Sequence, residues 1–279
     1  MEVRANAKVN LCLDVLRRRK DGYHDLEMIM VPLQLHDLLQ VELAKQDELH
    51  SDDKQMPLDE HNTICRVISL MREMYQLKAH FYVSVRKHIP MEAGLAGGSA
   101  DAAAMIHAID ILCGLHLSME DKIRIGKQIG ADVPFCLVNQ PALVSGIGEK
   151  IEPFSFSCDF HMLLVKPSEG VSTKTAYQML DLARCAHPDC EAVKAKLQED
   201  DFAGLCQEIG NSLEESAFRL TSAVQKLKAE LTAYGFAGVL MSGSGSCVFA
   251  LTQDESLLKD AYQHFRQHYP FVELTTVRK

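Results

Sequence analysis

The sequence predicts an α+β fold in which helices pack against mainly antiparallel sheets. The chain has 279 residues, 47% of them hydrophobic, which is enough to bury a substantial core. Segments with the two-residue period of strands are interspersed with segments that have helical spacing. The two kinds alternate only in part, whereas a doubly wound sheet requires regular alternation. We therefore expect strands that pair mostly with antiparallel neighbours.

The first half of the chain reads as a set of strands followed by helices. The predicted strands lie at residues 3–16, 28–32, 38–43, 81–85 and 142–146. The predicted helices lie at residues 62–76, 99–113 and 119–129. Residues 47–60 are polar and charged, so we expect a surface loop there.

The composition changes around residues 153–159, and we place a domain boundary there, giving domains 1–154 and 155–279. The predicted strands of the second domain lie at residues 161–165, 238–241, 247–251 and 271–275. Its predicted helices lie at residues 173–183, 190–198, 202–208, 221–234 and 256–268.

Charge and cysteine usage exclude several classes of protein. The formal net charge is −9, which argues against a nucleic-acid binder, because such proteins cluster Lys and Arg. No apolar run approaches the ~20 residues that a membrane helix needs. The nine cysteines are scattered, odd in number and without a Cys-x-x-Cys pair. We expect reduced cysteines in a cytoplasmic protein that binds no membrane.

Residues 90–104 carry the most informative motif, Pro-Met-Glu-Ala-Gly-Leu-Ala-Gly-Gly-Ser-Ala-Asp-Ala-Ala-Ala. Glycines allow close backbone approach to a ligand, and Ser99 is a candidate N-cap for the alanine-rich helix that follows. The N–H groups of a helix start favour anions, above all phosphate. The alternative is a strand-to-helix turn that needs small residues. The motif lacks the lysine of a Walker A loop and the spacing of a dinucleotide fingerprint, so it indicates another kind of phosphate loop.

Four further segments have both a functional and a structural interpretation. Lys8 interrupts a neutral strand and either faces solvent or serves a site. Asp132, before Val-Pro, is either a catalytic carboxylate or the residue of an Asx turn or helix cap. Gly22-Tyr23-His24 forms a turn whose rings serve packing or ligand stacking, and Ser242–Ser246 forms either a hairpin or a small-residue wall beside a ligand.

Together these segments resemble the GHMP kinases, a family of small-molecule kinases. Pro90–Ala100 resembles the family's glycine loop, and Gly243-Ser-Gly245 resembles its C-terminal Gly-Ser-Gly loop. The other matching blocks are Ala7–Leu11, Asp21–His24, Gly130–Phe135, Val171–Tyr177 and Asn211–Glu214. The blocks follow one another in the family's order over nearly the whole chain. The Gly-Tyr-His and Gly-Ala-Asp-Val-Pro-Phe pair is typical of members that act on a cytidine diphosphate-linked polyol.

The resemblance implies a ribosomal-protein-S5-like N-terminal domain that binds ATP and a ferredoxin-like C-terminal domain on the substrate side. It implies transfer of the ATP γ-phosphoryl group to a hydroxyl of the polyol, with Mg2+ as the second cofactor. We expect no nucleic-acid or membrane partner, and a monomer or weak homodimer.

The resemblance also assigns roles to residues. Asp132 would accept the hydroxyl proton, and Lys8 would orient the hydroxyl and offset charge. The implied ATP-binding residues are Pro90, Met91, Ala93, Gly94, Leu95, Ala96, Gly97, Gly98, Ser99, Ala100, Asn62 and Lys87. The implied substrate-binding residues are Asn10, Tyr23, His24, Thr173, Tyr177, Gly243 and Ser244. The sequence supplies no set of metal ligands.

The chain departs from the family pattern at Glu92 and Ala96, where glycine is common, and Asp101 places an acid in the following helix. An acid beside a triphosphate is unfavourable unless it faces away or helps to hold Mg2+, so we expect weaker ATP binding than is usual for the family. Two alternatives stay open: a family kinase acting on mevalonate, homoserine or a sugar, and a non-catalytic nucleotide sensor. The tyrosines favour a nucleobase on the acceptor, and the presence of both Lys8 and Asp132 favours catalysis.

Overall fold

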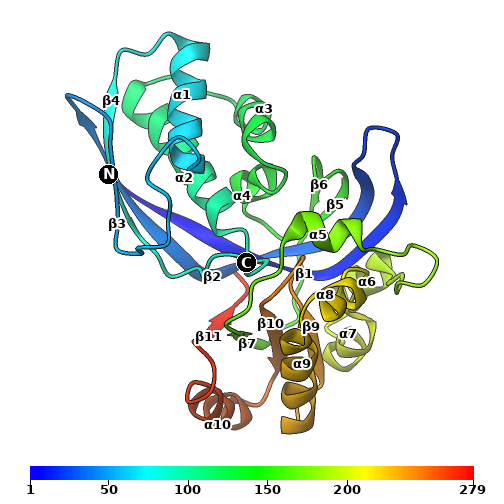
Figure 1. Ribbon diagram of the computed structural model, residues 1–279. Helices are drawn as coiled ribbons and strands as arrows, with labels where there is room; N and C mark the ends of the chain where they lie inside the picture. Colours follow the sequence, from blue (N-terminus) through cyan, green and yellow to red (C-terminus); the bar gives the residue numbers. More distant parts are fainter. The chain divides into compact units, whose positions relative to one another are not determined.

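The computed structural model describes residues 1–279, and its contacts divide the chain into two compact units. The first unit comprises residues 1–7, 35–91 and 96–139, and the second comprises residues 8–34, 92–95 and 140–279. The long strands β1 (Glu2–Arg18) and β2 (His24–Ala44) each contribute residues to both units (Figure 1). The predicted boundary between residues 154 and 155 stays a prediction.

The first unit combines a small sheet with a cluster of helices. Strand β4 (His80–Arg86) pairs antiparallel with the second half of β2 and parallel with β3 (Glu48–Ser51). The helices are α1 (Thr63–Tyr75), α2 (Gly97–Cys113), α3 (Met119–Ile129) and α4 (Val133–Val138). Helix α2 contacts the other three, and its alanines allow this close packing because they carry only a methyl group.

The second unit contains a four-stranded antiparallel sheet in the order β11-β7-β10-β9. Its strands are β7 (His161–Lys166), β9 (Gly238–Met241), β10 (Val248–Thr252) and β11 (Phe271–Thr276). Helix α9 (Ser222–Tyr234) contacts β9 and β10, and α10 (Glu255–Phe265) contacts β7, β10 and β11 (Figure 1). Every residue of the central strand β10 is buried as a result.

Further strands of the second unit pair with the long N-terminal strands. Strand β5 (Ala142–Gly146) is antiparallel to residues 26–30 of β2 and to β6 (Lys150–Pro153). Strand β8 (Gly210–Asn211) runs parallel to Cys12 and Leu13 of β1. The remaining helices are α5 (Thr173–Gln178), α6 (Cys190–Gln198), α7 (Phe202–Glu208) and α8 (Glu214–Leu220).

Several predicted elements differ from the observed ones. Residues 28–32 and 38–43 belong to one continuous strand, because the polar Asp37 is fully buried and hydrogen-bonded instead of marking a turn. Strand β3 lies inside the predicted loop 47–60, and α5 ends at residue 178 instead of 183. Helix α2 begins at Gly97, so Ser99 is not its N-cap. Ala96 holds that position with a φ of 59° and no side-chain capping bond.

The prediction that all cysteines are reduced is wrong for one pair. Cys12 on β1 and Cys190 at the start of α6 form a disulfide that joins residues 178 positions apart, with Cα atoms 5.5 Å from each other. The other seven cysteines are free. Sequence spacing carries no information about a pair this distant, because only the fold brings the strand and the helix together.

No helix in the structure has both the length and the apolar character needed to cross a membrane.

Candidate functional site

The Gly-rich loop, residues 90–100, contacts a second glycine-containing loop at residues 242–247. Within the second unit, the backbone N–H groups of Ser246 and Cys247 donate to the carbonyl oxygens of Glu92 and Ala93. Gly94 has a φ of 73°, and a Cβ there would overlap the carbonyl oxygen of Ser242. Gly94 is therefore required both by its left-handed conformation and by close contact between the loops.

Lys8 is a buried lysine, so the interpretation in which it faces solvent is wrong. Only 4% of the residue is exposed, and its Nζ donates to Asn10 Oδ1 at 2.7 Å and to the Gly94 carbonyl oxygen at 2.9 Å. Lys8 and Asn10 lie two positions apart on β1 and therefore share a face of the strand. Burying an ammonium is costly unless acceptors surround it, and these two oxygens meet that need.

The loop Ser242–Ser246 belongs to the hairpin between the antiparallel strands β9 and β10, and it lies beside this lysine. Asn211 Nδ2 donates to the carbonyl oxygens of Met241 and Gly243, both at 2.8 Å, and these two bonds hold the backbone at the start of the loop. A Cβ on Gly243 would lie 3.3 Å from Lys8 Nζ. The structure therefore brings the predicted residues Lys8, Asn10 and Gly243 together.

Helix α5 contains two further predicted residues, Thr173 and Tyr177. Its N-cap is Ser172, whose side chain accepts from the Thr175 N–H. Thr173 Oγ1 forms a 2.7 Å hydrogen bond with Ser244 Oγ, which attaches the helix start to the loop 242–246.

A pair of aromatic rings lies where α5 meets the start of β2. His24 and Tyr177 stack with ring centroids 5.2 Å apart and an interplanar angle of 28°. Burial and the nearby Arg18 lower the pKa of His24, so its ring is neutral at physiological pH. Tyr23 lies in the preceding turn with 61% of its surface exposed. The His24 and Tyr177 rings form an apolar platform with polar edges, suited to a flat heterocycle.

Glu92, the first departure from the family pattern, lies beside the segment that precedes α5. Its carboxylate fills the space next to Gly170, where a Cβ would overlap it. Its φ of 51° shows that the loop holds a non-glycine residue in a conformation that glycine usually occupies.

In the first unit, the Gly-rich loop continues into the first turn of α2. A Cβ on Gly97 would lie 3.0 Å from Ile89 Cγ2 and 3.5 Å from Lys87 Nζ, so a larger residue would displace its neighbours. No side chain caps this helix start, so its first N–H groups receive no capping bond from a side chain. An anion is the natural partner of such a terminus.

Lys87 lies beneath this turn in a buried cluster of charges. Its Nζ donates to Asp37 Oδ2 and, at 2.7 Å, to Asp101 Oδ2. Asp37 Oδ1 in turn accepts the backbone N–H groups of His88 and Ile89 at 2.6 and 2.8 Å. Lys87 is one of the implied ATP-binding residues, and in the structure its ammonium is held by two carboxylates.

Asn62 and Asp132, the remaining predicted residues, both precede helices of the first unit. Asn62 is the N-cap of α1, and its side chain accepts from the Ile64 N–H and donates to the Pro57 carbonyl oxygen. Asp132 occupies the N-cap position of α4, yet its side chain makes no capping bond. Capping therefore accounts for Asn62 and does not account for Asp132.

Sequence reasoning missed three residues that organise these sites. Asn211 was part of a matching block but had no assigned role, and Ser242 Oγ donates to the Gly94 carbonyl oxygen at 3.0 Å. Asp37 lies between the predicted strands 28–32 and 38–43 and had no assigned role. No sequence signal was available for Asp37, because its burial and its partners appear only in the fold.

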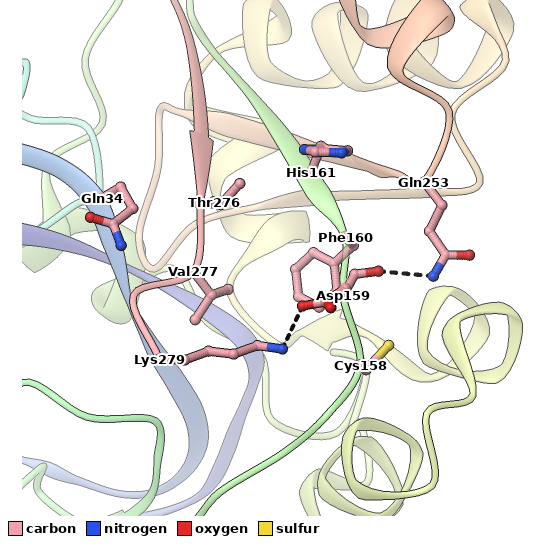
Figure 2. Close-up of a pocket in the computed structure, with 9 residues that line it drawn as sticks. All are labelled: Gln34, Cys158, Asp159, Phe160, His161, Gln253, Thr276, Val277 and Lys279. Carbon is pink, nitrogen blue, oxygen red and sulfur yellow. Dashed lines mark hydrogen bonds and ion pairs between the residues drawn. The ribbon is translucent and has the colours of Figure 1, made fainter.

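A separate pocket of about 660 Å3 lies where β7 begins and β10 and β11 end (Figure 2). Lys279 Nζ donates to Asp159 Oδ1 at 2.6 Å across it, and Gln253 Nε2 donates to the Asp159 carbonyl oxygen at 2.8 Å. None of the predicted site residues lines this pocket.

Comparison with known proteins assigns the chain to a class. The family model described as the N-terminal domain of GHMP kinases matches residues 62–140, and the model for the C-terminal domain matches residues 193–270. A mevalonate kinase of Methanococcus jannaschii has a similar fold, with a TM-score of 0.70 at 12% identity over 100% of this chain and 98% of that one. The fold is thus that of a two-domain GHMP kinase.

Curated relatives resemble the chain over nearly its whole length. It is 40% identical to a 4-diphosphocytidyl-2-C-methyl-D-erythritol kinase of Thermoanaerobacter pseudethanolicus, over 98% of this chain and 94% of that protein. It is 38% identical to the enzyme of that name from Bacillus cytotoxicus, over 93% and 91% of the two chains. A crystal structure of 4-(cytidine 5'-diphospho)-2C-methyl-D-erythritol kinase matches with a TM-score of 0.85 at 31% identity, covering 100% of both chains. The chain belongs to the GHMP kinase family, and it is a phosphotransferase.

Proposed function

We propose that this protein transfers the γ-phosphoryl group of ATP to the 2-hydroxyl of 4-diphosphocytidyl-2-C-methyl-D-erythritol. The observation that carries the proposal is the identity of 38–40% over more than nine-tenths of both chains to kinases of that name. The stacked His24–Tyr177 pair supports it independently, because an aromatic face can stack on a cytosine ring, and mevalonate, homoserine and a sugar have no such ring.

The residues of this chain fit a triphosphate at the Gly-rich loop. Gly97 packs so closely on Ile89 and Lys87 that a Cβ would be crowded, which keeps this turn of the loop bare of side chains, and no side chain caps the start of α2. ATP bound there would supply the phosphoryl group, and the chain's part is to position it and to stabilise its charge.

Mg2+ fits this chain only in an arrangement shared with the nucleotide. The structure contains no group of three or more His, Cys, Asp or Glu residues that could hold a metal. Mg2+ commonly binds through one or two protein oxygens, water and substrate phosphates, so it would enter as the ATP complex and offset phosphate charge.

Asp132 and Lys8 carry the proposed chemistry. Asp132 accepts the proton of the acceptor hydroxyl, the role that the resemblance to the GHMP kinases gives to this position. Lys8 orients that hydroxyl and offsets the charge that develops on it. Its ammonium is held in one position by Asn10 and the Gly94 carbonyl oxygen, so little reorganisation is needed during the reaction.

A coupled assay of ADP release tests this function with three acceptors in parallel. We expect turnover with 4-diphosphocytidyl-2-C-methyl-D-erythritol and none above background with mevalonate or homoserine. Preference for either of the other acceptors would assign the chain to a different kinase of the family. Nucleotide binding without ADP release from any acceptor would identify a non-catalytic sensor.

A further inference from the structure

Asp101 belongs to the buried cluster beneath the Gly-rich loop, and only one of its two carboxylate oxygens is hydrogen-bonded. Only 3% of the residue is exposed. Its Oδ2 accepts from Lys87, whereas its Oδ1 is buried with no hydrogen-bond partner. A carboxylate normally accepts bonds at both oxygens when it is buried, because an unpaired anionic oxygen away from water is costly.

The cluster also contains more negative than positive charge when both carboxyls are ionised. Lys87 supplies one cation to two carboxylates. Asp37 accepts two backbone N–H bonds in addition to Lys87, so it is the better stabilised anion. Burial, opposed by Lys87 and reinforced by Asp37, raises the pKa of Asp101 to about 7. Asp101 is thus the member of the cluster that titrates near neutral pH.

Lys87 and Asp37 are the charged groups that face Asp101, from the end of β4 and from β2. Of the helices packed against α2, α4 contains no charged residue. On α1 and α3, the charged residues are exposed or paired elsewhere, as Lys122 is with Asp110 at 2.7 Å. A charge added near the cluster therefore changes mainly the protonation of Asp101.

The loop that is proposed to receive the triphosphate lies directly above this cluster. A Cβ on Gly97 would lie 3.5 Å from Lys87 Nζ, and Asp101 is in the same helix, four residues later. A bound triphosphate brings several negative charges close to both groups. Negative charge nearby favours the protonated form of a carboxyl.

We propose that Asp101 is a positioning residue for the nucleotide, which takes up a proton from solvent when a triphosphate binds at the Gly-rich loop. The proton is carried by Oδ1, while Oδ2 keeps its bond to Lys87. The cluster then changes from net negative to neutral, and the Lys87 charge is balanced by Asp37 and faces the phosphates. This inference rests on the proposed function only in that ATP binds at this loop.

Calorimetry on the full chain tests the proposal, with the Mg2+ complex of adenosine 5'-(β,γ-imido)triphosphate as the probe. Titration in two buffers of different ionisation enthalpy gives the number of protons taken up per nucleotide bound. At about pH 7.5 we expect an uptake between about 0.3 and 0.8 proton in the wild type, and affinity that falls up to about tenfold per pH unit above neutrality.

Asp101→Asn removes the titrating group and keeps the shape, so we expect no net uptake and an affinity independent of pH in this range. Asp110→Asn is the matched control, because Asp110 is a buried, lysine-paired carboxyl of the same helix, and it should keep the wild-type uptake. The wild-type measurement needs no variant, so an absence of proton uptake overturns the inference even where Asp101→Asn does not fold.

The outcomes separate this inference from the proposed function. Nucleotide binding with no proton uptake by the wild type, or equal uptake by Asp101→Asn, overturns the inference and leaves the kinase assignment intact. Absence of both nucleotide binding and turnover overturns the two together.

Discussion

Lys8 Nζ donates a 2.9 Å hydrogen bond to the carbonyl oxygen of Gly94, so a strand lysine and the Gly-rich loop are directly connected within one unit. The same ammonium donates to Asn10. These bonds fix the position of the one buried cation on β1, and they make its removal the first test of the proposed chemistry.

Lys8→Met should lower kcat by roughly 10²–10³-fold, the usual effect of deleting one preorganised donor at a reacting oxygen. Steady-state ADP release measures it. Lys20→Met is the control, because Lys20 is exposed in the turn after β1, and its kcat should match the wild type. A Lys8→Met enzyme with wild-type kcat would exclude Lys8 from catalysis.

Asp132→Asn should reduce kcat by roughly 10²–10⁴-fold, because it removes the proposed proton acceptor and preserves shape. The Kd for the Mg2+–nucleotide complex should stay unchanged in calorimetry. Glu120→Gln, an exposed acid in the first turn of α3, is the control for loss of one negative charge. Equal kcat losses in the two variants would contradict the assignment.

Tyr177→Ala should raise the KM for the cytidylylated acceptor by roughly tenfold or more, since stacking a base on an aromatic ring contributes about 1–3 kcal/mol. The KM for ATP should not change. Tyr177→Phe keeps the ring and should behave like the wild type. If both substitutions raise the two KM values together, the ring serves the fold and not the nucleobase.

Gly94→Ala should destabilise the protein by more than the ~1–2 kcal/mol that a left-handed conformation costs alanine, because the new methyl also meets Ser242. Gly22→Ala measures the cost of the left-handed conformation alone. Its φ is 89° and the space around it is open. Urea unfolding curves give both free energies, and equal losses would show that the loops do not contact closely in solution.

Reduction of the Cys12–Cys190 disulfide should lower the free energy of unfolding by about 2–5 kcal/mol, because the bond closes a long segment in the unfolded chain. Urea unfolding with and without a phosphine reductant measures the difference. Cys190→Ser should be insensitive to the reductant. If the free energy of unfolding of the wild type is the same with and without the reductant, the two cysteines are not joined in solution.

Clear periodicity made parts of the fold predictable. Strand β1, helix α3 and the strands of the four-stranded sheet have regular patterns, and each was placed within a few residues. The continuity of β2 was not predictable, because a polar residue inside a strand resembles a turn until its partners are known. The buried Asp37 has three such partners, and all of them lie about 50 residues further along the chain.

The candidate site was predictable where the resemblance to the family indicated which residues lie close together. Lys8, Asn10, Gly243, Thr173 and Ser244 meet in the second unit, although they lie far apart in the sequence. Contacts made by a side chain were not predictable from its type. The Lys87 ammonium is engaged by two buried acids, and Ser99 does not cap the helix that starts before it.

Residues 173–190 are anchored at both ends, by the Thr173–Ser244 hydrogen bond at one end and by the bond between Cys190 and Cys12 at the other. Between the anchors, His187 Nδ1 lies 2.7 Å from Asp14 Oδ1 on β1, and Tyr177 stacks on His24. A chain held in this way loses its conformational freedom when the protein folds and not when a ligand arrives. The aromatic platform is therefore preorganised, and binding on it carries little entropic penalty.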